Sequence, residues 1–541
     1  GDEFSDPYGI NNTGFGYGAF EKLFNGNSNI AFGGDALKNA TNASGNVAIG
    51  FGSLRTTTYT FGQTAVGTVS LRDNTTGSEN TAVGFAASFS NTIGNENVAV
   101  GHRSLFSNLG GNYNTAIGTG TMENANDNSN SHDASNTAVG YSALKGSSNP
   151  SQNTGSKNVA LGAQVLVNNT SGSFNTALGS FSMSSNQNGN ANVAIGSLSL
   201  YSNLTGANNI AIGDSALFKS ANISGNVSIG SSSMFENTSG TENVAVGART
   251  LNKNVSGSGN VAIGSNALAS NSNASNNTAV GNYALNKTID GLSNTALGWG
   301  AAYSNQSGDF NLAIGTSALY QNTAGNNNTA IGISAGTNNS GSGNVFIGYK
   351  AGELEFGSNK LYIDNNGNNS SSALIFGDFA TNKLRVNNQL GIGVTPINPI
   401  QTASGANCDV AGVWNNASDI RLKKNIQDIR YGLKEVLTLR PVSYEMKSND
   451  QAQIGFIAQE VRAILPELIS GTEGKMEDNM TLSMSYGNLT AVLVNAIKEQ
   501  QLVIDQQLEE INKLKIKINA QEQNQKDLRA EIDDIKKLLQ P

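Results

Sequence analysis

A short motif that recurs at a nearly constant interval constrains this chain more than any other feature. Its form at Asn46–Gly50 is Asn-Val-Ala-Ile-Gly, and variants of it begin at 20 positions between Asn12 and Asn344. Sixteen of the nineteen intervals are 17 residues long, two of 22 residues flank Asn136, and one is 16. Seventeen residues are too few for a repeat that contains a helix, but they suit one turn of a solenoid with two short strands.

Each copy of the motif has the alternation expected of a short β-strand. A β-branched residue, an alanine and a second branched residue point to alternate faces. We expect glycine and asparagine to occupy positive-φ corners, and stacked turns to align the asparagines in ladders that satisfy their side-chain amides. The pattern predicts a mainly β chain, with a parallel β-solenoid or β-roll of about 20 coils of 17 residues across residues 12–352.

The small residues of the repeat allow two interpretations. Alanine fills the third position of most copies, as at Ala31 and Ala262, and alanine or serine often fills the eighth. In a single-chain solenoid, these small side chains would simply make a thin interior. The interpretation that we favour is that this wall packs against another subunit near a shared axis.

Composition excludes several kinds of chemistry. The 541 residues include 78 Asn and 63 Gly, and only 13% are charged, which is about half the usual share. A single cysteine, Cys408, excludes a disulfide framework and a multi-thiolate zinc site. Two histidines, His102 and His132, leave little for a histidine metal cluster or a Ser–His–Asp site. We therefore expect no cofactor and no metal ion.

Charge and hydropathy also limit the partners. The net charge is −8 and no basic cluster is present, which argues against nucleic acid. No run of about 18 apolar residues occurs, so we expect no membrane insertion. The chain begins with Gly1 rather than Met, which is expected if an N-terminal segment such as a signal peptide has been removed or replaced.

The repeat resembles the head repeats of trimeric autotransporter adhesins. The shared elements are Asn-x-Ala-[Ile/Val]-Gly and the Ser/Ala-Leu pair that follows it, and the resemblance covers about residues 12–352. It implies a left-handed parallel β-roll in a homotrimer. The family commonly has a slightly shorter period, so the resemblance supports coiled, trimeric β structure rather than one particular roll geometry.

Composition changes sharply near residue 418. Only 15 of the 32 Lys and Arg residues lie in residues 1–417, and the other 17 lie in the last 124 residues. Between the repeats and this charged region, Lys360–Asp364, Ala373–Gly377 and Leu390–Gly393 are predicted strands. The predicted organisation is an N-terminal attachment segment (1–11), a solenoid rod (12–352), a β-rich neck (353–417), a small α+β domain (418–490) and a trimeric coiled coil (491–541).

Residues 418–500 resemble the intramolecular chaperone auto-processing domain at the C-termini of phage tail spikes, endosialidases and some membrane-anchored transcription factors. The resemblance rests on the order of the blocks Ser418–Ile426, Pro441–Tyr444, Ile454–Val461, Leu465–Glu467 and Tyr486–Leu489. It implies a domain that trimerises, templates the folding of the fibre ahead of it, and then cuts itself off immediately before the serine of the first block.

This resemblance places the scissile bond at Ala417–Ser418, with Ser418 as the nucleophile and Lys423 as the general base. A serine hydroxyl is a weak nucleophile, and a lysine acts as a base only when burial or neighbouring cations lower its pKa. Arg421 and Lys424 are candidates for such cations. The chain would then be at most a single-turnover Ser–Lys endopeptidase. The alternative for an isolated Ser-Asp pair is a helix cap or a solvated turn.

A seven-residue repeat follows Tyr486. Its first phase consists of Ile497, Ile504, Ile511, Ile518, Gln525, Ile532 and Leu539, and its second of Gln500, Gln507, Leu514, Gln521, Leu528 and Ile535. Sustained heptads predict a coiled coil, and isoleucine at this seam permits a trimer. A single amphipathic helix on a globular core is the alternative, but the repeat exceeds a normal helix length.

These features predict a structural homotrimeric fibre or adhesin at an extracellular surface. A phage tail fibre or receptor-binding protein is the alternative, so the location is a cell-surface filament or a virion tail. The expected partners are two further copies and a host-surface glycan or other receptor. The broken period makes the loops at 123–135 and 145–157 the candidate receptor contacts, whereas Trp299 and Trp414 are interpreted as packing residues.

Two other functions are less favoured by the sequence. A glycan-cleaving tail spike needs paired carboxylates, and the repeats are poor in acidic residues. An ice-binding solenoid would need a regular threonine array, but threonine alternates irregularly with valine at the second position of the motif.

Overall fold

The computed structural model describes residues 9–367, 370–392, 394, 399–402, 407–408, 410, 414–415, 417–446, 451–473 and 481–539. The chain forms two compact units, residues up to 403 together with 407–414, and residues 404–406 together with 415–541. Residues 1–8 of the predicted attachment segment lie outside the described residues.

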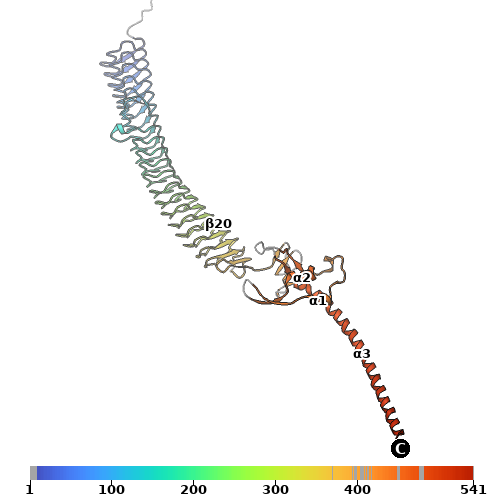
Figure 1. Ribbon diagram of the computed structural model, residues 1–541. Coiled ribbons are helices and arrows are strands. Elements are labelled where there is room, and N and C mark those ends of the chain that lie inside the picture. The colour runs from blue at the N-terminus through green and yellow to red at the C-terminus, as the bar shows by residue number, and fades with distance from the viewer. Residues whose placement is uncertain are drawn as a thin grey trace, which may run out of the picture. The chain divides into compact units, whose positions relative to one another are not determined.

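The first unit is a solenoid of about 21 turns, in which one short parallel strand per turn stacks on the next (Figure 1). Its strands are β1 (Thr13–Phe15), β2 (Ile30–Phe32), β3 (Val47–Ile49), β4 (Thr64–Val66), β5 (Thr81–Val83), β6 (Val98–Val100), β8 (Thr115–Ile117), β10 (Thr137–Val139), β11 (Val159–Leu161), β12 (Thr176–Leu178), β13 (Val193–Ile195), β14 (Ile210–Ile212), β15 (Val227–Ile229), β16 (Val244–Val246), β17 (Val261–Ile263), β18 (Thr278–Val280), β19 (Thr295–Leu297), β20 (Leu312–Ile314), β21 (Thr329–Ile331), β22 (Val345–Ile347) and β23 (Lys360–Ile363). The register aligns equivalent motif residues, such as Ala194 with Ala211. The predicted parallel solenoid is confirmed, and β23 adds one turn beyond the motif copies because it pairs in parallel with β22.

The alternation within each strand decides what fills the interior. The central alanine points inward and is fully buried, as at Ala211 and Ala262. The ninth residue of the repeat, as at Leu217 and Met234, is fully buried in the same core. The alanines therefore form the thin interior of one chain. The favoured interpretation, that this wall packs against another subunit, is wrong, because these side chains are already covered within the chain.

The remainder of most turns is a wall of unusual backbone conformation rather than a second strand, and only the paired β7 (Gly111–Asn112) and β9 (His132–Asp133) add second strands among the described turns. The seventh and ninth residues have positive φ, as at Arg249 (φ 55°) and Leu251 (φ 49°). The Leu251 N–H donates to Ala267 O of the next turn, and the Arg249 N–H donates to Ser231 O of the previous turn, each at 3.0 Å. The prediction of two strands per turn is therefore wrong. The motif glycine does have the predicted positive φ, as at Gly247 (φ 134°), but leucines take a corner expected for asparagine.

Left-handed leucines need compensation, because this conformation costs a non-glycine residue roughly 1–2 kcal/mol. Full burial of a leucine side chain returns about 1.5–3 kcal/mol, and the backbone groups of this wall are paired between turns. The side chain and the stacking together therefore hold the corner in place.

The predicted asparagine ladder is confirmed. Asn209 donates to Asn192 Oδ1 through both its backbone N–H (3.0 Å) and its side-chain amide (3.2 Å). A second, unanticipated ladder runs through the twelfth position of the repeat. There the Asn186 amide donates to Asn169 Oδ1, and the Asn203 amide donates to Asn186 Oδ1, both at 2.7 Å. Most of these buried amides are satisfied from turn to turn, which explains much of the Asn excess. The second ladder is interrupted after Asn203, whose Oδ1 has no hydrogen-bond partner among the described residues because Ser220 takes the next position.

Replacing Asn186 with alanine is expected to lower the free energy of unfolding of the solenoid by about 2 kcal/mol, because Asn169 and Asn203 each lose a buried partner. Urea unfolding followed by circular dichroism measures this change. The control is Asn188→Ala at an exposed position of the same turn, for which we expect a change within about 0.5 kcal/mol. Equal losses in the two variants would contradict a stabilising role for the second ladder.

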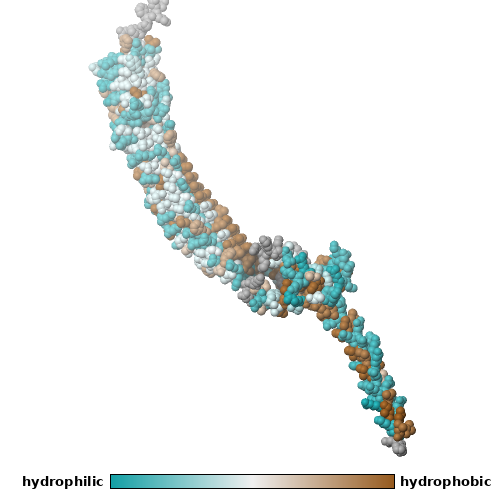
Figure 2. All heavy atoms as spheres, in the orientation of Figure 1, coloured by the Kyte–Doolittle hydropathy of each residue, from teal (hydrophilic) through white to brown (hydrophobic). Residues whose placement is uncertain are grey.

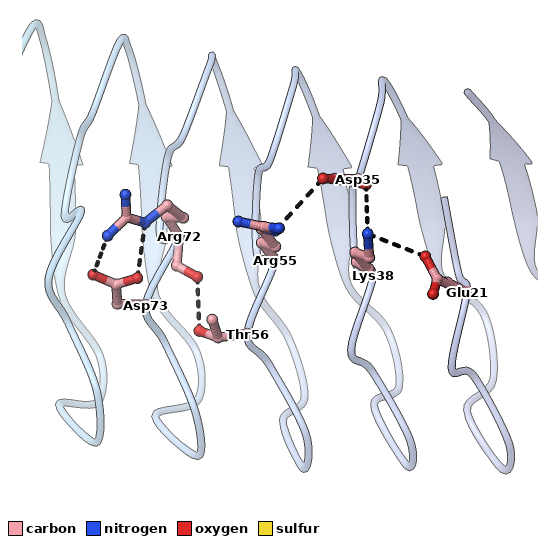
Figure 3. Close-up of polar contacts among 7 residues, drawn as sticks. All are labelled: Glu21, Asp35, Lys38, Arg55, Thr56, Arg72 and Asp73. Atoms are coloured by element: carbon pink, nitrogen blue, oxygen red, sulfur yellow. Dashed lines mark hydrogen bonds and ion pairs between the residues drawn. The ribbon is translucent and has the colours of Figure 1, made fainter. Parts of the chain in front are cut away.

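Ion pairs also link successive turns near the beginning of the solenoid (Figure 3). Lys38 Nζ lies 3.1 Å from a carboxylate oxygen of both Glu21 and Asp35, and Arg55 Nε lies 3.5 Å from Asp35. The hydrogen bond to Asp35, and then the one to Glu21, raises the pKa of the Lys38 ammonium. Because such surface pairs contribute little to stability, the solenoid is stabilised mainly by the asparagine ladders and the buried core.

After the repeats, the chain continues into antiparallel strands. Strand β23 pairs with β24 (Ile375–Asp378), and β24 pairs with β25 (Lys383–Val386). A smaller sheet consists of β26 (Leu390–Ile392), β27 (Ile400–Thr402), β28 (Asn407–Cys408) and β29 (Trp414–Asn415). The three strands predicted for this region correspond to β23, β24 and β26, whereas the other strands were not predicted.

The second unit is a small α+β fold followed by a long helix. Its elements are η2 (Ile420–Leu422), α1 (Leu433–Thr438), β30 (Val442–Glu445), β31 (Ala452–Gly455), α2 (Ala458–Ile464), η3 (Pro466–Leu468), β32 (Ile469–Ser470), β33 (Ser483–Met484) and α3 (Tyr486–Leu538). Val461, Leu465 and Leu468 form its core together with Leu489 and Val492 from the first turns of α3. The predicted order of a small α+β region and a long C-terminal helix is confirmed.

Beyond this core, helix α3 is exposed on every face. From Ile497 to Leu539, each residue is exposed, and the seam residues Ile504, Ile511 and Ile518 are 46%, 48% and 52% exposed. Within the described part of the chain, no helix combines the length and the apolarity that crossing a bilayer requires.

Candidate functional site

The structure brings the predicted nucleophile and base together. A single 3-10 turn, η2, separates them, and the Lys423 ammonium donates a hydrogen bond of 2.9 Å to Ser418 Oγ. Ser418 directly follows Ala417, and all three residues are exposed in the single chain. The pair therefore has the contact that proton transfer from a serine to a lysine needs.

The residues between this pair also form the helix cap that was the alternative interpretation. The Arg421 N–H donates to Asp419 Oδ1 at 2.8 Å, which caps η2. The Arg421 guanidinium lies 2.6 Å from Asp419 Oδ2, and this hydrogen bond lowers the pKa of the Asp419 carboxyl. Arg421 is therefore paired with Asp419, and its predicted role as a cationic neighbour of Lys423 stays a prediction. The cap and the Ser–Lys contact coexist, because they use different side chains.

A pocket of about 350 Å³ in the same unit was not anticipated. Its floor includes Leu465 and Val492, and its rim carries Arg430, Tyr431 and Glu467. The Glu467 carboxylate accepts hydrogen bonds of 2.8 Å from both Arg430 and the Tyr431 hydroxyl. The backbone N–H of Glu467, followed by the Tyr431 hydroxyl, lowers the pKa of this carboxyl. The Leu465-Pro466-Glu467 block was the sequence signal that pointed to this region. Its partners, Arg430 and Tyr431, are distant in the sequence, and only folding brings them to Glu467.

The two inserted loops lie on neighbouring turns of the solenoid. The first contains β9 (His132–Asp133), which pairs in parallel with β7 (Gly111–Asn112), and the second contains η1 (Pro150–Gln152). Glu123 ties three turns together, because its carboxylate lies 2.9 Å from Lys145 Nζ and 2.5 Å from Arg103 Nε. The loops are thus anchored, and their role as receptor contacts stays a prediction.

Electrostatics support that anchoring. Burial alone would raise the pKa of the Glu123 carboxyl, but hydrogen bonds from Lys145 and then Arg103 lower it overall. Among the described residues, no group of three or more His, Cys, Asp or Glu side chains could hold a metal ion.

The outward face of the strands is apolar along much of the solenoid. The second and fourth residues of the motif flank the buried alanine and point outward. Exposed members include Ile49, Val83, Ile117, Leu178, Ile210, Ile263, Leu297, Ile331 and Ile347. Figure 2 shows apolar side chains gathered in a stripe along the solenoid. We call this surface the strand face. A row of exposed apolar side chains that continues over many turns is typical of an interaction site.

Comparison with known proteins identifies one region of the chain. Residues 418–470 match the model of a family described as chaperone of endosialidase. No curated protein and no solved structure shows significant similarity to the chain. The match begins at Ser418, the residue whose hydroxyl oxygen accepts the hydrogen bond from Lys423. The C-terminal region of this chain therefore contains a chaperone domain of the endosialidase type, preceded by a β-solenoid of about 21 turns.

Proposed function

We propose that this chain forms a homotrimeric, receptor-binding fibre of the phage-tail kind, which its C-terminal domain assembles and then releases. The chaperone match at residues 418–470 carries this proposal, because chaperones of this family act in trimeric tail proteins. The same match favours a tail fibre over the bacterial surface adhesin that the repeats alone suggested.

The exposed helix supports a trimer. Helix α3 has 53 residues, and only its first part is covered by the core of its own chain. An apolar seam at heptad spacing is expected to be buried by the same seam of other copies. Isoleucine in the first phase of the heptad is compatible with three strands.

The strand face supports the same assembly along the rod. A partner that covers it must match its apolar stripe for many turns. Another copy of this chain has the same strands at the same spacing, so it meets this requirement. In the proposed trimer, the outward Val, Ile and Leu residues pack between copies, while the inward alanines stay inside each chain.

The proposed release step uses the atoms that η2 brings together. Lys423 Nζ, as a free amine, accepts the proton of the Ser418 hydroxyl while Oγ attacks the carbonyl carbon of Ala417. The bond from this carbon to the Ser418 nitrogen breaks as that nitrogen takes the proton, which leaves an ester. Water then hydrolyses the ester, so the products are an Ala417 carboxylate and a Ser418 amino terminus with its hydroxyl restored.

Assembly would control this step. Ser418 and Lys423 are both exposed in the single chain, and a lysine serves as a base only after it is partly dehydrated. Three copies that meet around η2 would exclude water from the pair. Release would then follow folding, which is useful for a fibre that needs its chaperone once.

The trimer is tested by replacing Ile511 with glutamate. We expect the trimer dissociation constant to rise at least about 100-fold, because the change buries three charges at one seam. Sedimentation equilibrium of the chain carrying Ser418→Ala, which keeps the helix attached, measures this constant.

Ile516→Glu is the matched control, because Ile516 lies on the same helix, outside both phases of the heptad, and is exposed. It is expected to leave the trimer intact. An equal effect of the two substitutions, or a wild-type chain that stays monomeric, would contradict the proposed assembly.

A further inference from the structure

Four aromatic side chains gather on the wall of three successive turns near the end of the solenoid. Tyr303 and Tyr320 occupy the same position of adjacent turns, so the spacing between turns stacks their rings at 4.9 Å with an angle of 6°. Trp299 lies 6.3 Å from Tyr320 and is within 16° of parallel to it. Tyr283 completes the group at 6.3 Å from Tyr303. We call these four residues the aromatic platform.

The chain makes room for this platform. Gly300 has φ +60°, and a Cβ atom there would lie 3.1 Å from Tyr320 Cε2. The glycine therefore lets the Tyr320 ring lie close to the backbone. Trp299 remains 49% exposed and Tyr283 39% exposed, so the apolar rings are open to solvent rather than buried in the core. The sequence-based interpretation of Trp299 as a packing residue misses this exposure.

Another aromatic stack on the solenoid is covered by cations of the same chain. Phe89 and Phe106 stack at 4.9 Å, but Arg72 lies 3.6 Å above the first ring and Arg103 lies 3.9 Å above the second. Among the residues that the structure describes, no guanidinium or ammonium lies over the Trp299 ring in this way. Within the described residues, the Trp299 and Tyr320 rings of the platform thus lack this internal cover.

The surroundings of the platform are polar and nearly uncharged. The corresponding segments of the three turns, 282–287, 299–304 and 316–321, contain no Asp or Glu and a single Lys. That residue, Lys287, lies 5.0 Å from the centre of the Tyr303 ring. Exposed amide and hydroxyl groups come from Asn282, Thr316 and Gln321. Flat rings with neutral donors and acceptors around them suit a ligand with an apolar face and a polar edge.

We propose that the aromatic platform binds the pyranose rings of a neutral oligosaccharide. The C–H face of a sugar would pack on Trp299 and Tyr320, while its hydroxyl groups would bond to the neighbouring amides and hydroxyls. The near absence of charge disfavours a sialylated or phosphorylated ligand. This inference rests on the proposed receptor-binding function and names its ligand class.

The test uses the two tryptophans of the chain. Trp414→Phe leaves Trp299 as the single tryptophan, so its fluorescence reports directly on the platform. The probes are cellohexaose, maltohexaose, chitohexaose and mannohexaose at up to millimolar concentration. We expect at least one of them to change the Trp299 emission in a saturable way. A second variant, Tyr320→Ala, is expected to weaken that binding at least about fivefold.

The control is Phe218→Ala, because Phe218 belongs to a stack of similar geometry. Its ring centroid lies 4.9 Å from that of Phe235 and 5.2 Å from that of Tyr201. It should leave saccharide binding unchanged. No saturable response to any probe would overturn the inference, and so would an equal loss in both variants. If Tyr320→Ala instead dissociates the trimer, the platform is an interface between copies and the inference is also overturned. Trimer formation and self-cleavage are measured in separate experiments. A failure of saccharide binding would therefore leave the proposed assembly and release untouched.

Discussion

Replacement of Ser418 by alanine is expected to leave the chain as a single polypeptide of 541 residues, whereas the wild type separates into residues 1–417 and 418–541. Without the hydroxyl, no oxygen can attack the Ala417 carbonyl, and the rate should fall at least about 1,000-fold. Mass spectrometry of both purified proteins measures this directly, because the two products differ in mass and in their new termini.

The neighbouring lysines provide a matched pair for the base. Lys423 contacts Ser418 Oγ at 2.9 Å, whereas Lys424, the next residue, makes no ion pair among the described residues. Lys423→Met should therefore stop cleavage. Lys424→Met removes a candidate neighbouring cation but not the base itself, so it should slow cleavage without stopping it. Cleavage that persists in Ser418→Ala or Lys423→Met would show that other groups cut the bond.

The second large effect is expected in the rod, from Gly230→Ala. Gly230 has φ +136°, and a Cβ atom there would lie 2.4 Å from Gly247 O and 2.5 Å from Gly247 C in the next turn. Since both atoms belong to a hydrogen-bonded backbone, the turns must separate to accept the methyl group. We expect the free energy of unfolding to fall by about 3 kcal/mol or more.

Gly225→Ala is the control for this substitution. Gly225 also has positive φ, at +72°, but the nearest atom to its Cβ would be Glu242 Cγ at 3.7 Å. Only the conformational cost of about 1 kcal/mol should remain. Urea unfolding curves of the two variants compare these costs. Similar midpoints would mean that the close approach between turns does not limit the stability of the solenoid.

The sequence predicts the solenoid well, because one feature determines both its period and its register. A 17-residue step with a strand of alternating faces requires stacking of equivalent residues, and the paired Ala194 and Ala211 show this register. The Asn192–Asn209 ladder follows from the same repetition. What repeats exactly in the sequence repeats in space, so few alternatives remain.

The wall opposite the strand could not be predicted in the same way. The left-handed conformation of Leu251 contradicts the local preference of leucine. It arises because the side chain is buried in the core and the backbone N–H pairs with the next turn. Tertiary contacts therefore override propensity at this corner. The role of the alanines was misjudged for a related reason, since spacing alone does not distinguish the inside of a chain from an interface.

The candidate site likewise contains one contact that the sequence predicts and others that it does not. Ser418 and Lys423 are close in sequence, so a short turn suffices to join them, and their contact was predictable. The ion pair of Arg421 with Asp419 was not predicted, because a carboxylate two residues away can be reached by several rotamers. The Arg430–Glu467 pair joins segments 37 residues apart and depends on the fold of the domain.

The most direct test of the central claim is native mass spectrometry of the fibre purified after expression of the wild-type chain. The account predicts one assembly with the mass of three copies of residues 1–417, each ending at Ala417, and a separate C-terminal fragment that begins at Ser418. A particle made of uncleaved chains, or a rod of residues 1–417 with one or two copies, would contradict the account.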